Sequence, residues 1–264
     1  MKIIKKSSLY LVASVLLVIG LSLTSYAQIE GQDTLFQIST IDALLQGLYD
    51  GDITTGQLLD HGNFGLGTFH ALDGEMVILD GVAYQVKSTG EVKEVSDIVK
   101  TPFAVTTYFE EDKKAVFKGI KDIEELKEEL TELLPSKNIF YAVKIEGEFK
   151  HVKTRSVPKQ SKPYPKLAEI AATQPTFDFY NAKGTLVGFW SPYYVNGINV
   201  PKFHLHFITE DRTGGGHVLE CQLKRGEVQI DYSSGFQLIL PHSEAFRNIK
   251  LNEQSGNDLG DVEE

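Results

Sequence analysis

Residues 203–219 read FHLHFITEDRTGGGHVL, which is the most informative pattern in the chain. Apolar residues alternate with histidines from Phe203 to Phe207, which is the period of a strand with one buried face. The loop from Asp211 to Gly216 is rich in glycine and can reverse the chain, after which a second strand begins at His217. The stretch therefore predicts a β-hairpin with one apolar face and one face that carries histidines.

This hairpin is expected to bring three histidines to one patch of sheet. His204 and His206 are two positions apart, so both side chains leave the same face of the strand. A register that pairs His206 near His217 adds the third imidazole. Three imidazole nitrogens on a rigid hairpin suit a divalent metal, most often zinc, and leave positions open for a carboxylate, water or substrate. The alternative is coincidence, because the chain contains 7 histidines.

The remaining histidines and the single cysteine have weaker claims to a functional role. His61, His70, His151 and His242 stand in loops, at strand edges or in an alternating strand, and we expect them to be hydrogen-bonded or solvated. Cys221 has no second cysteine with which to form an intramolecular disulfide. Its place in an alternating strand predicts a buried, unreactive thiol.

The rest of the chain predicts many short strands and a few helices. Aspartate–glycine dipeptides at 73–74 and 80–81 favour tight turns, so residues 66–88 are expected to form a β-meander. Apolar residues at helical spacing predict helices over 40–49, 55–60 and 122–134. Alternating apolar residues predict further strands over 101–109, 138–152, 176–190 and 203–240. The expected fold class is α+β and β-rich, with mixed or antiparallel sheets in two halves and a few flanking helices.

A connection with several prolines, residues 158–165, is the expected boundary between the two halves. Residues 28–157 would form an N-terminal α+β half. Residues 158–250 would form a C-terminal β half that carries the histidine hairpin. The last residues, 251–264, are polar and acidic, and composition alone predicts a frayed tail there.

Residues 1–27 have the pattern of a cleaved secretory signal peptide. Three lysines precede an apolar run over 9–23, and small residues stand at Ser25 and Ala27. This predicts export to the periplasm or the medium, with a mature chain that begins at Gln28. The alternative is an uncleaved membrane anchor, because the apolar run approaches the length that spans a bilayer.

The charge of the chain limits its partners. The 264 residues carry a formal net charge of −10, and loss of the leader removes three lysines and no acid. A chain this acidic is a poor partner for nucleic acid, and after leader cleavage it is not expected to bind an anionic membrane. With 42% hydrophobic and 23% charged residues it has the composition of a globular protein. The oligomeric state stays open, a homodimer included.

Eight stretches of the chain also carry a resemblance to a known family. They are LFQISTIDALLQG (35–47), GLGTFHALDGEM (65–76), KTPFAVTTYFE (100–110), NIFYAVK (138–144), TRSVPKQSKPYP (154–165), KGTLVGFWSP (183–192), NVPKFHLHFITEDRTGGGHVL (199–219) and LPH (240–242). Together they reach from beyond the leader almost to the tail. In these stretches the chain resembles the bacterial alpha-acetolactate decarboxylases.

The resemblance implies a zinc-dependent carboxy-lyase that converts 2-acetolactate to acetoin and CO2 in acetoin and butanediol biosynthesis. It also implies the residues of the site. They are the zinc ligands His204, His206 and His217, the glutamates Glu75 and Glu263 at the metal, Arg155 facing the substrate, and Thr68 lining the pocket. The tail 251–264 would then fold toward the active site instead of fraying.

The chemistry of the substrate gives each of these groups a role. Loss of the carboxylate leaves negative charge that spreads into the neighbouring ketone as an enediolate, and a zinc ion would stabilise that charge as a Lewis acid. Arg155 would hold the carboxylate through its planar fork of donors. Glu75 or Glu263 would protonate the enediolate, and the sequence leaves open which of them does so.

Two other classes of protein compete with this interpretation. A metal-binding cupin-like module would use the spacing His-x-His-x-x-x-Glu, which His204, His206 and Glu210 match, and His242 would be its only candidate for a later histidine ligand. The other competitor is a secreted zinc-binding protein without enzymatic activity. Formation of acetoin from acetolactate without an added cofactor separates both from a decarboxylase.

Overall fold

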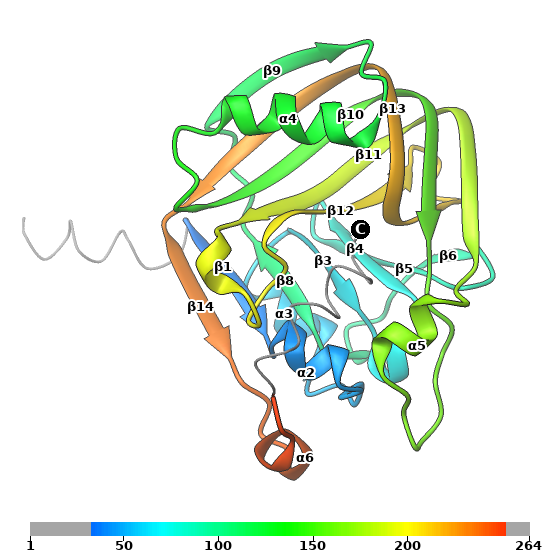
Figure 1. The fold of residues 1–264 in the computed structure, drawn as a ribbon, viewed down its shortest axis with the longest axis vertical. Coiled ribbons are helices and arrows are strands. Elements are labelled where there is room, and N and C mark those ends of the chain that lie inside the picture. Colours follow the sequence, from blue (N-terminus) through cyan, green and yellow to red (C-terminus); the bar gives the residue numbers. More distant parts are fainter. Residues whose placement is uncertain (1–32, 252–264) are drawn as a thin grey trace, which may run out of the picture.

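The structure is a computed structural model, and it describes residues 33–251. The predicted leader 1–27 and nearly all of the predicted tail, including Glu263, lie outside the described residues. Within them, two β-sheets pack against each other, and short helices lie around the sheets (Figure 1). The predicted α+β, β-rich fold class is confirmed.

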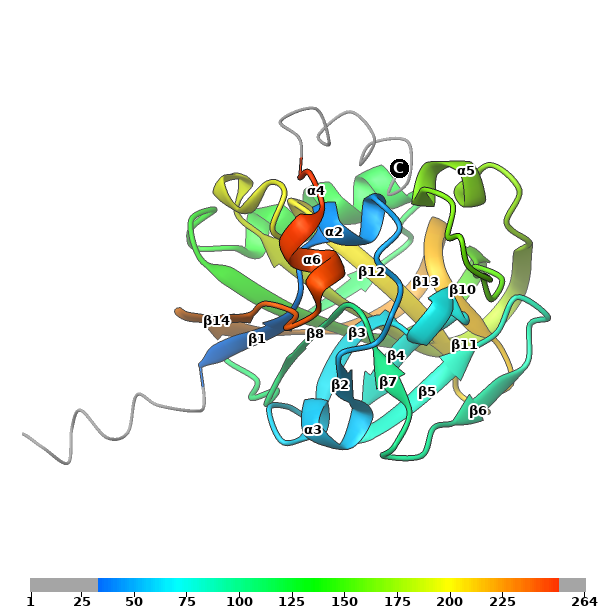
Figure 2. The same ribbon diagram turned by 90° about the horizontal axis from the view of Figure 1, so that it is seen from below.

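The first sheet has seven strands and is mixed. In spatial order its strands are β14 (Gly235–Ile239), β1 (Thr34–Ile38), β8 (Ala104–Thr107), β3 (Phe64–Thr68), β4 (Glu75–Leu79), β5 (Val82–Val86) and β6 (Val92–Glu94). Strand β14 runs parallel to β1, and the other neighbours are antiparallel. Figure 2 shows β14 and β1 at one edge of this sheet and β6 at the opposite edge. A separate small sheet pairs β2 (Ile53–Thr54) with β7 (Lys100–Thr101).

The second sheet has five strands and is antiparallel throughout. Its strands are β10 (Phe140–Arg155), β11 (Thr176–Ser191), β12 (Lys202–Thr209), β13 (Gly215–Ser233) and β9 (Lys113–Lys118). An additional pairing between β10 and β13 joins the two ends of the series β10 to β13. These four strands therefore form a closed circuit of hydrogen-bonded neighbours. Strand β9 pairs with residues 225–230 of β13.

The predicted meander over 66–88 is confirmed as β3, β4 and β5. The two-residue turn between β4 and β5 consists of Asp80 and Gly81, with φ angles of 54° and 78°. Positive φ at both central positions is the signature of a type I′ turn, whose twist matches that of the strands it joins, and aspartate followed by glycine favours it. This turn sets the register in which Glu75 begins β4.

The helices are short, apart from one. They are α2 (Ile41–Leu45), α3 (Thr55–Leu59), α4 (Ile123–Leu133), α5 (Leu167–Ala171) and α6 (Glu244–Asn248), with single 3-10 turns at η1 (His70–Leu72) and η2 (Tyr193–Val195). The Asp122 side chain accepts a hydrogen bond from the Glu125 N–H and caps the start of α4. The buried residues of α4 are Leu126 and Leu130, which pack on the outer face of the five-stranded sheet (Figure 1).

Strand alternation assigns side chains to layers. On β12, Phe203, Leu205 and Phe207 belong to the core beneath α4. On β4, Val77 belongs to the core between the two sheets, whereas Met76 packs on the far face of the seven-stranded sheet. Side chains two positions apart on a strand share a face. His204 and His206 on β12, and Glu75 at the start of β4, therefore face the space between the sheets. The functional site lies in that space.

Sheet membership does not follow the predicted halves. Strands β9 and β10 come from residues 28–157 but belong to the five-stranded sheet, and β14 comes from residues 158–250 but joins the seven-stranded sheet. The halves 28–157 and 158–250 therefore stay a prediction about domains and do not describe the sheets. Within residues 33–251, none of the helices has the length and the apolar character that a membrane span requires.

Candidate metal centre and substrate pocket

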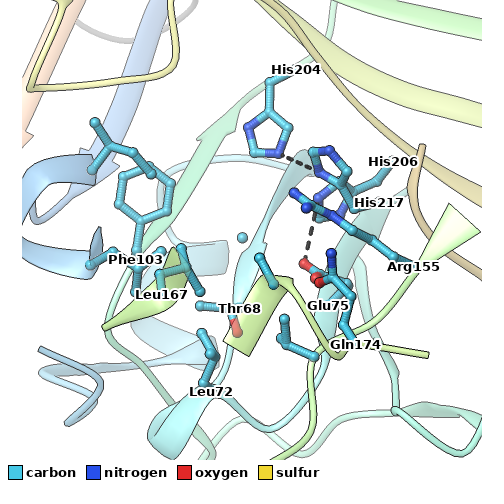
Figure 3. Close-up of a pocket in the computed structure, with 15 residues that line it drawn as sticks. Thr68, Leu72, Glu75, Phe103, Arg155, Leu167, Gln174, His204, His206 and His217 are labelled. Carbon is cyan, nitrogen blue, oxygen red and sulfur yellow. Dashed lines mark hydrogen bonds and ion pairs between the residues drawn. The ribbon is translucent and has the colours of Figure 1, made fainter. Parts of the chain in front are cut away.

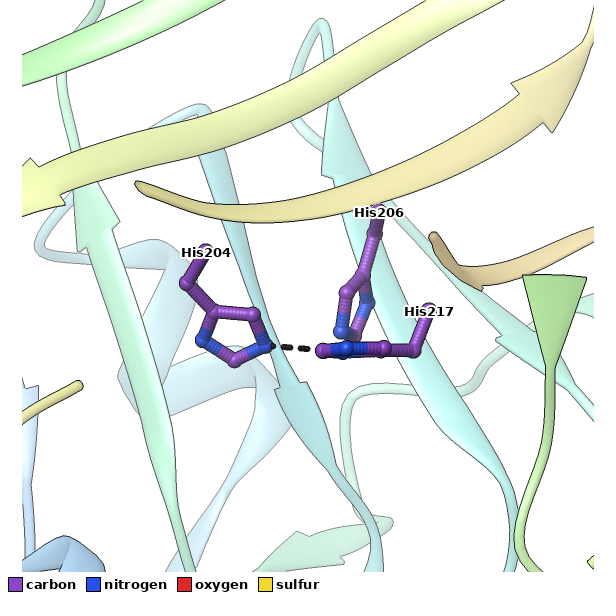
Figure 4. A group of neighbouring side chains, drawn as sticks. All are labelled: His204, His206 and His217. Carbon is purple, nitrogen blue, oxygen red and sulfur yellow. Dashed lines mark hydrogen bonds between the residues drawn. The ribbon is translucent and has the colours of Figure 1, made fainter. Parts of the chain in front are cut away.

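Three histidines converge at the centre of the structure. His206 and His217 are direct partners across the β12–β13 ladder, and His204 follows on the same face of β12. One ring nitrogen from each of the three lies within 4.8 Å of the others, and His204 Nε2 is 3.2 Å from His217 Nδ1 (Figure 4). Their exposed fractions are 8%, 1% and 3% for His204, His206 and His217. The predicted hairpin and its cluster of imidazoles are both present.

Glycine allows the strand of His217 to approach its neighbour. Gly216 has a φ of 130°, and a Cβ at this position would overlap the carbonyl oxygen of Arg155 on β10. A residue with a side chain would therefore push β13 away from β10. The last glycine of the Gly214–Gly216 run is thus needed to hold His217 beside Arg155, its partner across the ladder.

Each imidazole is neutral in this environment. Burial, together with the nearby Arg155, lowers the pKa of His204 to about 3. Burial also lowers the pKa values of His206 and His217 well below their usual range, and the positive charge of Arg155 adds to the effect, although the Met76 carbonyl offsets part of it for His206. Neutral imidazole is the form that binds a metal, because its unprotonated nitrogen carries a lone pair.

A backbone contact fixes the orientation of His206. Its Nδ1 lies 2.8 Å from the carbonyl oxygen of Met76, so Nδ1 carries the hydrogen and donates it. The other nitrogen, Nε2, is then an acceptor, and it has no hydrogen-bond partner among the described residues. A backbone carbonyl that accepts a hydrogen bond from the second ring nitrogen is typical of metal-ligating histidines. The His206 ring therefore presents a lone pair to the centre of the cluster.

Glu75 approaches the cluster from the opposite sheet. Its Oε2 lies 3.7 Å from His206 Nε2, and the residue is only 9% exposed (Figure 3). Glu75 pairs across the ladder with Thr68 on β3. The Thr68 hydroxyl donates to the carbonyl oxygen of Gly74 at 2.7 Å, which holds the turn that precedes Glu75. Thr68 thus both lines the pocket and supports the strand that carries the carboxylate.

Arg155 ends β10 and reaches the same space. Early in β10, Ala142 faces the core between the sheets and Val143 faces the core beneath α4, but later Val152 also faces the core beneath α4. The change of parity coincides with register shifts against β13 between Glu148 and His151. Because of these irregularities Arg155 faces the cluster, with an exposed fraction of 6%. Its Nε has no hydrogen-bond partner among the described residues.

All of these side chains line one pocket. It has an empty volume of about 460 Å³ and is bounded by both sheets, by α2 and by α5. The histidines, Glu75, Arg155 and Gln174 lie on one side, and the remaining wall is mostly apolar, with Leu72, Phe103 and Leu167 near Thr68 (Figure 3). A pocket with a few polar groups on an apolar background suits a small organic molecule.

The sequence did not single out several pocket residues. Gln174, Phe103 and Leu167 line the pocket, and none of them stood out as chemically distinctive in the sequence. Leu167 belongs to α5, a five-residue helix that follows the proline-containing connection. No apolar periodicity in the sequence predicted this helix. The stretch TRSVPKQSKPYP, which carried part of the family resemblance, leads directly to this helix and was the available signal.

The residues expected to be inert are accounted for. His61 stacks on Phe36, with ring centroids 3.8 Å apart, and His151 Nε2 lies 2.7 Å from Asp178 Oδ1. Gly51 donates its backbone N–H to His70 Nδ1. Burial raises the pKa of the Cys221 thiol to about 12, so the thiolate is scarce at neutral pH.

The ligand set of a cupin is not assembled. Glu210 is exposed in the turn after β12. His242 is exposed and lies 3.7 Å from Asp52. Neither belongs to the group of described residues that could hold a metal ion, which consists of His204, His206 and His217.

The donor set fits a metal ion. Three buried neutral imidazoles converge, one of them with an acceptor nitrogen that no described residue satisfies, and a carboxylate stands beside them. Three imidazole ligands with further positions open is the arrangement of a catalytic centre, since structural sites close all positions with protein ligands. Fold and site together define an enzyme that acts on a small molecule and has a candidate three-histidine metal centre.

Comparisons with known proteins identify the family. The sequence profile of the alpha-acetolactate decarboxylases matches residues 35–253. The alpha-acetolactate decarboxylase of Methanosarcina mazei is 49% identical over 88% of this chain and 80% of its own length, and that of Brevibacillus brevis is 43% identical over 94% and 95%. The crystal structure of alpha-acetolactate decarboxylase from Bacillus subtilis superimposes with a TM-score of 0.85 at 40% identity, over 87% of this chain and 99% of that one. The chain belongs to the alpha-acetolactate decarboxylase family and is a carboxy-lyase.

Proposed function

We propose that this chain decarboxylates 2-acetolactate to acetoin and CO2, with a zinc ion held by His204, His206 and His217. The observation that supports the proposal is the single pocket in which three neutral imidazoles, Glu75 and Arg155 meet, in a chain of this family. Zinc is favoured because it accepts three imidazole ligands and keeps positions open for substrate oxygens. When bound, it would supply Lewis acidity to the hydroxyl and keto oxygens of the substrate.

Arg155 binds the carboxylate that leaves. Its guanidinium can meet both carboxylate oxygens with parallel N–H donors, a match that a lysine cannot reproduce. Because the residue is 6% exposed, this charge-assisted contact acts in a poorly solvated environment and is stronger than on the surface. The contact fixes the direction in which the carboxylate leaves.

The reaction breaks the bond between C1 and C2 of the substrate. The electron pair of that bond is delocalised toward the neighbouring ketone, CO2 departs, and a proton added at C2 gives acetoin. The reaction therefore consumes one proton, which an acid in the pocket must deliver. Glu75 is the proposed donor among the described residues, and its position in the pocket, with Oε2 3.7 Å from His206 Nε2, supports that role.

Glu263 is the second proposed acid. We propose it on the family resemblance alone, because it lies outside the described residues. In this proposal the tail 251–264 folds toward the pocket and helps to exclude water from the reaction. The delivery of the proton is assigned to the pair of glutamates and not to one of them.

The apolar wall holds the two methyl groups of the substrate. Leu72, Phe103 and Leu167 offer aliphatic and aromatic surface opposite the charged groups. With the carboxylate on Arg155 and the methyl groups on this wall, a small hydroxy-keto acid has one favourable orientation. Water that would solvate the developing charge is displaced from the same surface.

Acetoin formation from 2-acetolactate, without an organic cofactor, is the experiment that tests this function. The purified protein should lose activity after treatment with a chelator and regain it with zinc, and elemental analysis should find one zinc per chain. His204→Ala, His206→Ala and His217→Ala should each lose both metal and activity. His242→Ala is the matched control, because this histidine is exposed and remote from the cluster. Active protein without any divalent metal would contradict the mechanism.

We also propose that the protein is exported. The lysines, the apolar run and the small residues of positions 1–27 support removal of this segment as a signal peptide. The acidic mature chain would then act on its small substrate outside the cytoplasm, without nucleic acid or membrane as a partner.

A further inference from the structure

Gln174 lies in the connection between α5 and β11, where the backbone is tied to the end of β10. The carbonyl oxygen of Pro175 accepts a hydrogen bond from the Ser156 N–H at 3.2 Å, and Thr176 pairs with Arg155 at the start of β11. The proline that follows Gln174 also restricts its backbone to extended conformations. The position of Gln174 is therefore fixed relative to Arg155.

The Gln174 side chain points into the pocket. It lines the cavity together with Glu75 and Arg155, and Figure 3 shows it beside Glu75. Its Oε1 is buried and has no hydrogen-bond partner among the described residues. A buried carbonyl oxygen without a donor is unfavourable, so such groups in native proteins are usually partnered or serve a function. The residue that carries this oxygen lines the pocket that the substrate would enter.

The hydrogen-bonding groups of the substrate complement this oxygen. In a 2-hydroxy-3-keto acid the carboxylate and ketone oxygens only accept hydrogen bonds, and the tertiary hydroxyl is the single donor. Arg155 offers only donors, so it suits the carboxylate. Among the pocket residues, the Thr68 hydroxyl donates to Gly74 and keeps the lone pairs of its oxygen, and His206 Nδ1 donates to Met76. Gln174 Oε1 differs from these groups because it is a neutral acceptor without a hydrogen-bond partner among the described residues.

We propose that Gln174 is a substrate-binding residue that determines specificity, and that its side-chain oxygen accepts the hydrogen of the substrate hydroxyl. The inference rests on the proposed function, because it assumes that the pocket takes a 2-hydroxy-3-keto acid. With Arg155 on the carboxylate and Gln174 on the hydroxyl, two of the substituents on C2 are held. The methyl group and the acyl group must then occupy the remaining directions. An acid without the hydroxyl leaves the oxygen buried and unpaired, and a site of that kind rejects it.

Two small acids of nearly equal shape test this directly. 2-Hydroxy-2-methylpropanoate carries the hydroxyl, and 2,2-dimethylpropanoate replaces it with a methyl group. Their affinities for the zinc-loaded protein are measured by calorimetry, which needs no turnover. The wild type should prefer the hydroxy acid. Gln174→Met removes the acceptor at similar volume, so it should reduce this preference roughly 5- to 10-fold, the range expected for one neutral hydrogen bond. The affinity for 2,2-dimethylpropanoate should not change.

Two further variants sharpen the comparison. Gln174→Glu keeps an acceptor oxygen, so it should keep the preference even though the added charge weakens the binding of both acids. Gln160→Met makes the same chemical change in the preceding connection, between β10 and α5, and outside the pocket lining, so it should leave both affinities unchanged. If Gln174→Met does not fold, Gln174→Leu takes its place.

The outcomes separate this inference from the proposed function. Equal weakening of both acids in Gln174→Met would mean that Gln174 only supports the pocket, and no change in either would mean that it does not touch the ligand. Either result overturns the inference. A wild type that binds the hydroxy acid but releases no CO2 from 2-acetolactate would overturn the proposed function. The role of Gln174 would then still be decided by the ratio of the two affinities in the wild type and in Gln174→Met.

Discussion

Asp231 on β13 is a buried acid outside the functional site, and its replacement by asparagine should stabilise the protein above neutral pH. The residue is 1% exposed, and no side chain among the described residues donates a hydrogen bond to its carboxylate. Burial raises the pKa of Asp231 from 3.8 to about 7. The backbone N–H of Glu110 offsets part of this rise, and the nearby acids Asp112 and Asp33 add to it. The folded chain thus holds a proton here that the unfolded chain releases.

The sign of the effect follows from linkage. A carboxyl with a raised pKa binds more protons in the folded state between about pH 4 and 7, so stability falls as the pH rises through that interval. A difference of about 3 pKa units corresponds to at most about 4 kcal/mol. Relaxation and water penetration reduce such costs, so we expect Asp231→Asn to gain about 1–3 kcal/mol at pH 8 and little at pH 4. For a chain of this size that is a rise in Tm of roughly 3–10 °C at pH 8.

The assay is chemical or thermal unfolding of wild type and Asp231→Asn between pH 4 and 9. The Asp231 contribution to the stability of the wild type should fall from pH 4 to 7 and then level off. It is obtained by subtracting the curve of the variant, which contains the contributions of all other titrating groups. The difference between the two curves should grow over the same interval. Asp60→Asn is the control, because this aspartate is exposed and should not alter the pH dependence. A difference that is constant with pH would refute the reasoning, since it would mean that Asp231 ionises normally in the folded chain.

Three further predictions concern the proposed function. Arg155→Lys should retain zinc but lose most of its turnover, because a point charge replaces a bidentate fork; near-normal turnover in a steady-state assay would return Arg155 to an ordinary ion-pairing role. Glu263→Gln, or a stop codon after Asn257, should leave the fold and the bound zinc intact and lower turnover at least about 10-fold, the scale for loss of an acid or base. A truncated, zinc-loaded enzyme with the full-length rate would show that the tail has no role in catalysis. The exported protein should begin at Gln28, and N-terminal sequencing that still finds Met1 in secreted material would exclude cleavage.

Local patterns predicted the elements that carry the site. Alternation over 203–207 set the faces of His204 and His206, and the glycine run specified the turn that returns the chain to His217. The aspartate–glycine turn at 80–81 likewise fixed the meander that begins with Glu75 on β4. In each case the signal lies within a few consecutive residues. It is either the two-residue alternation of a strand or a pair of residues that tolerates the positive φ angles of a tight turn.

Other features depended on contacts that no local pattern encodes. The face to which Arg155 points is set by irregular pairing between β10 and β13, and simple alternation from Ala142 would assign its parity incorrectly. Gln174 enters the pocket because the Ser156–Pro175 hydrogen bond ties its segment to β10. Resemblance to the family supplied the roles of Glu75 and Arg155, which composition and spacing alone did not single out.

The parallel pairing of β1 with β14 has a consequence for biosynthesis. Thr34 lies beside Gly235, so the first strand of the described chain receives one neighbour only after nearly all of the other strands have been made. Until then β1, with the apolar residues Leu35, Phe36 and Ile38, has an open edge during translation. Contacts between such distant residues form late, because the loop between them must first be closed. The nascent chain therefore cannot complete this sheet until synthesis is almost finished, which favours an unfolded chain during the period when an export machinery would have to engage it.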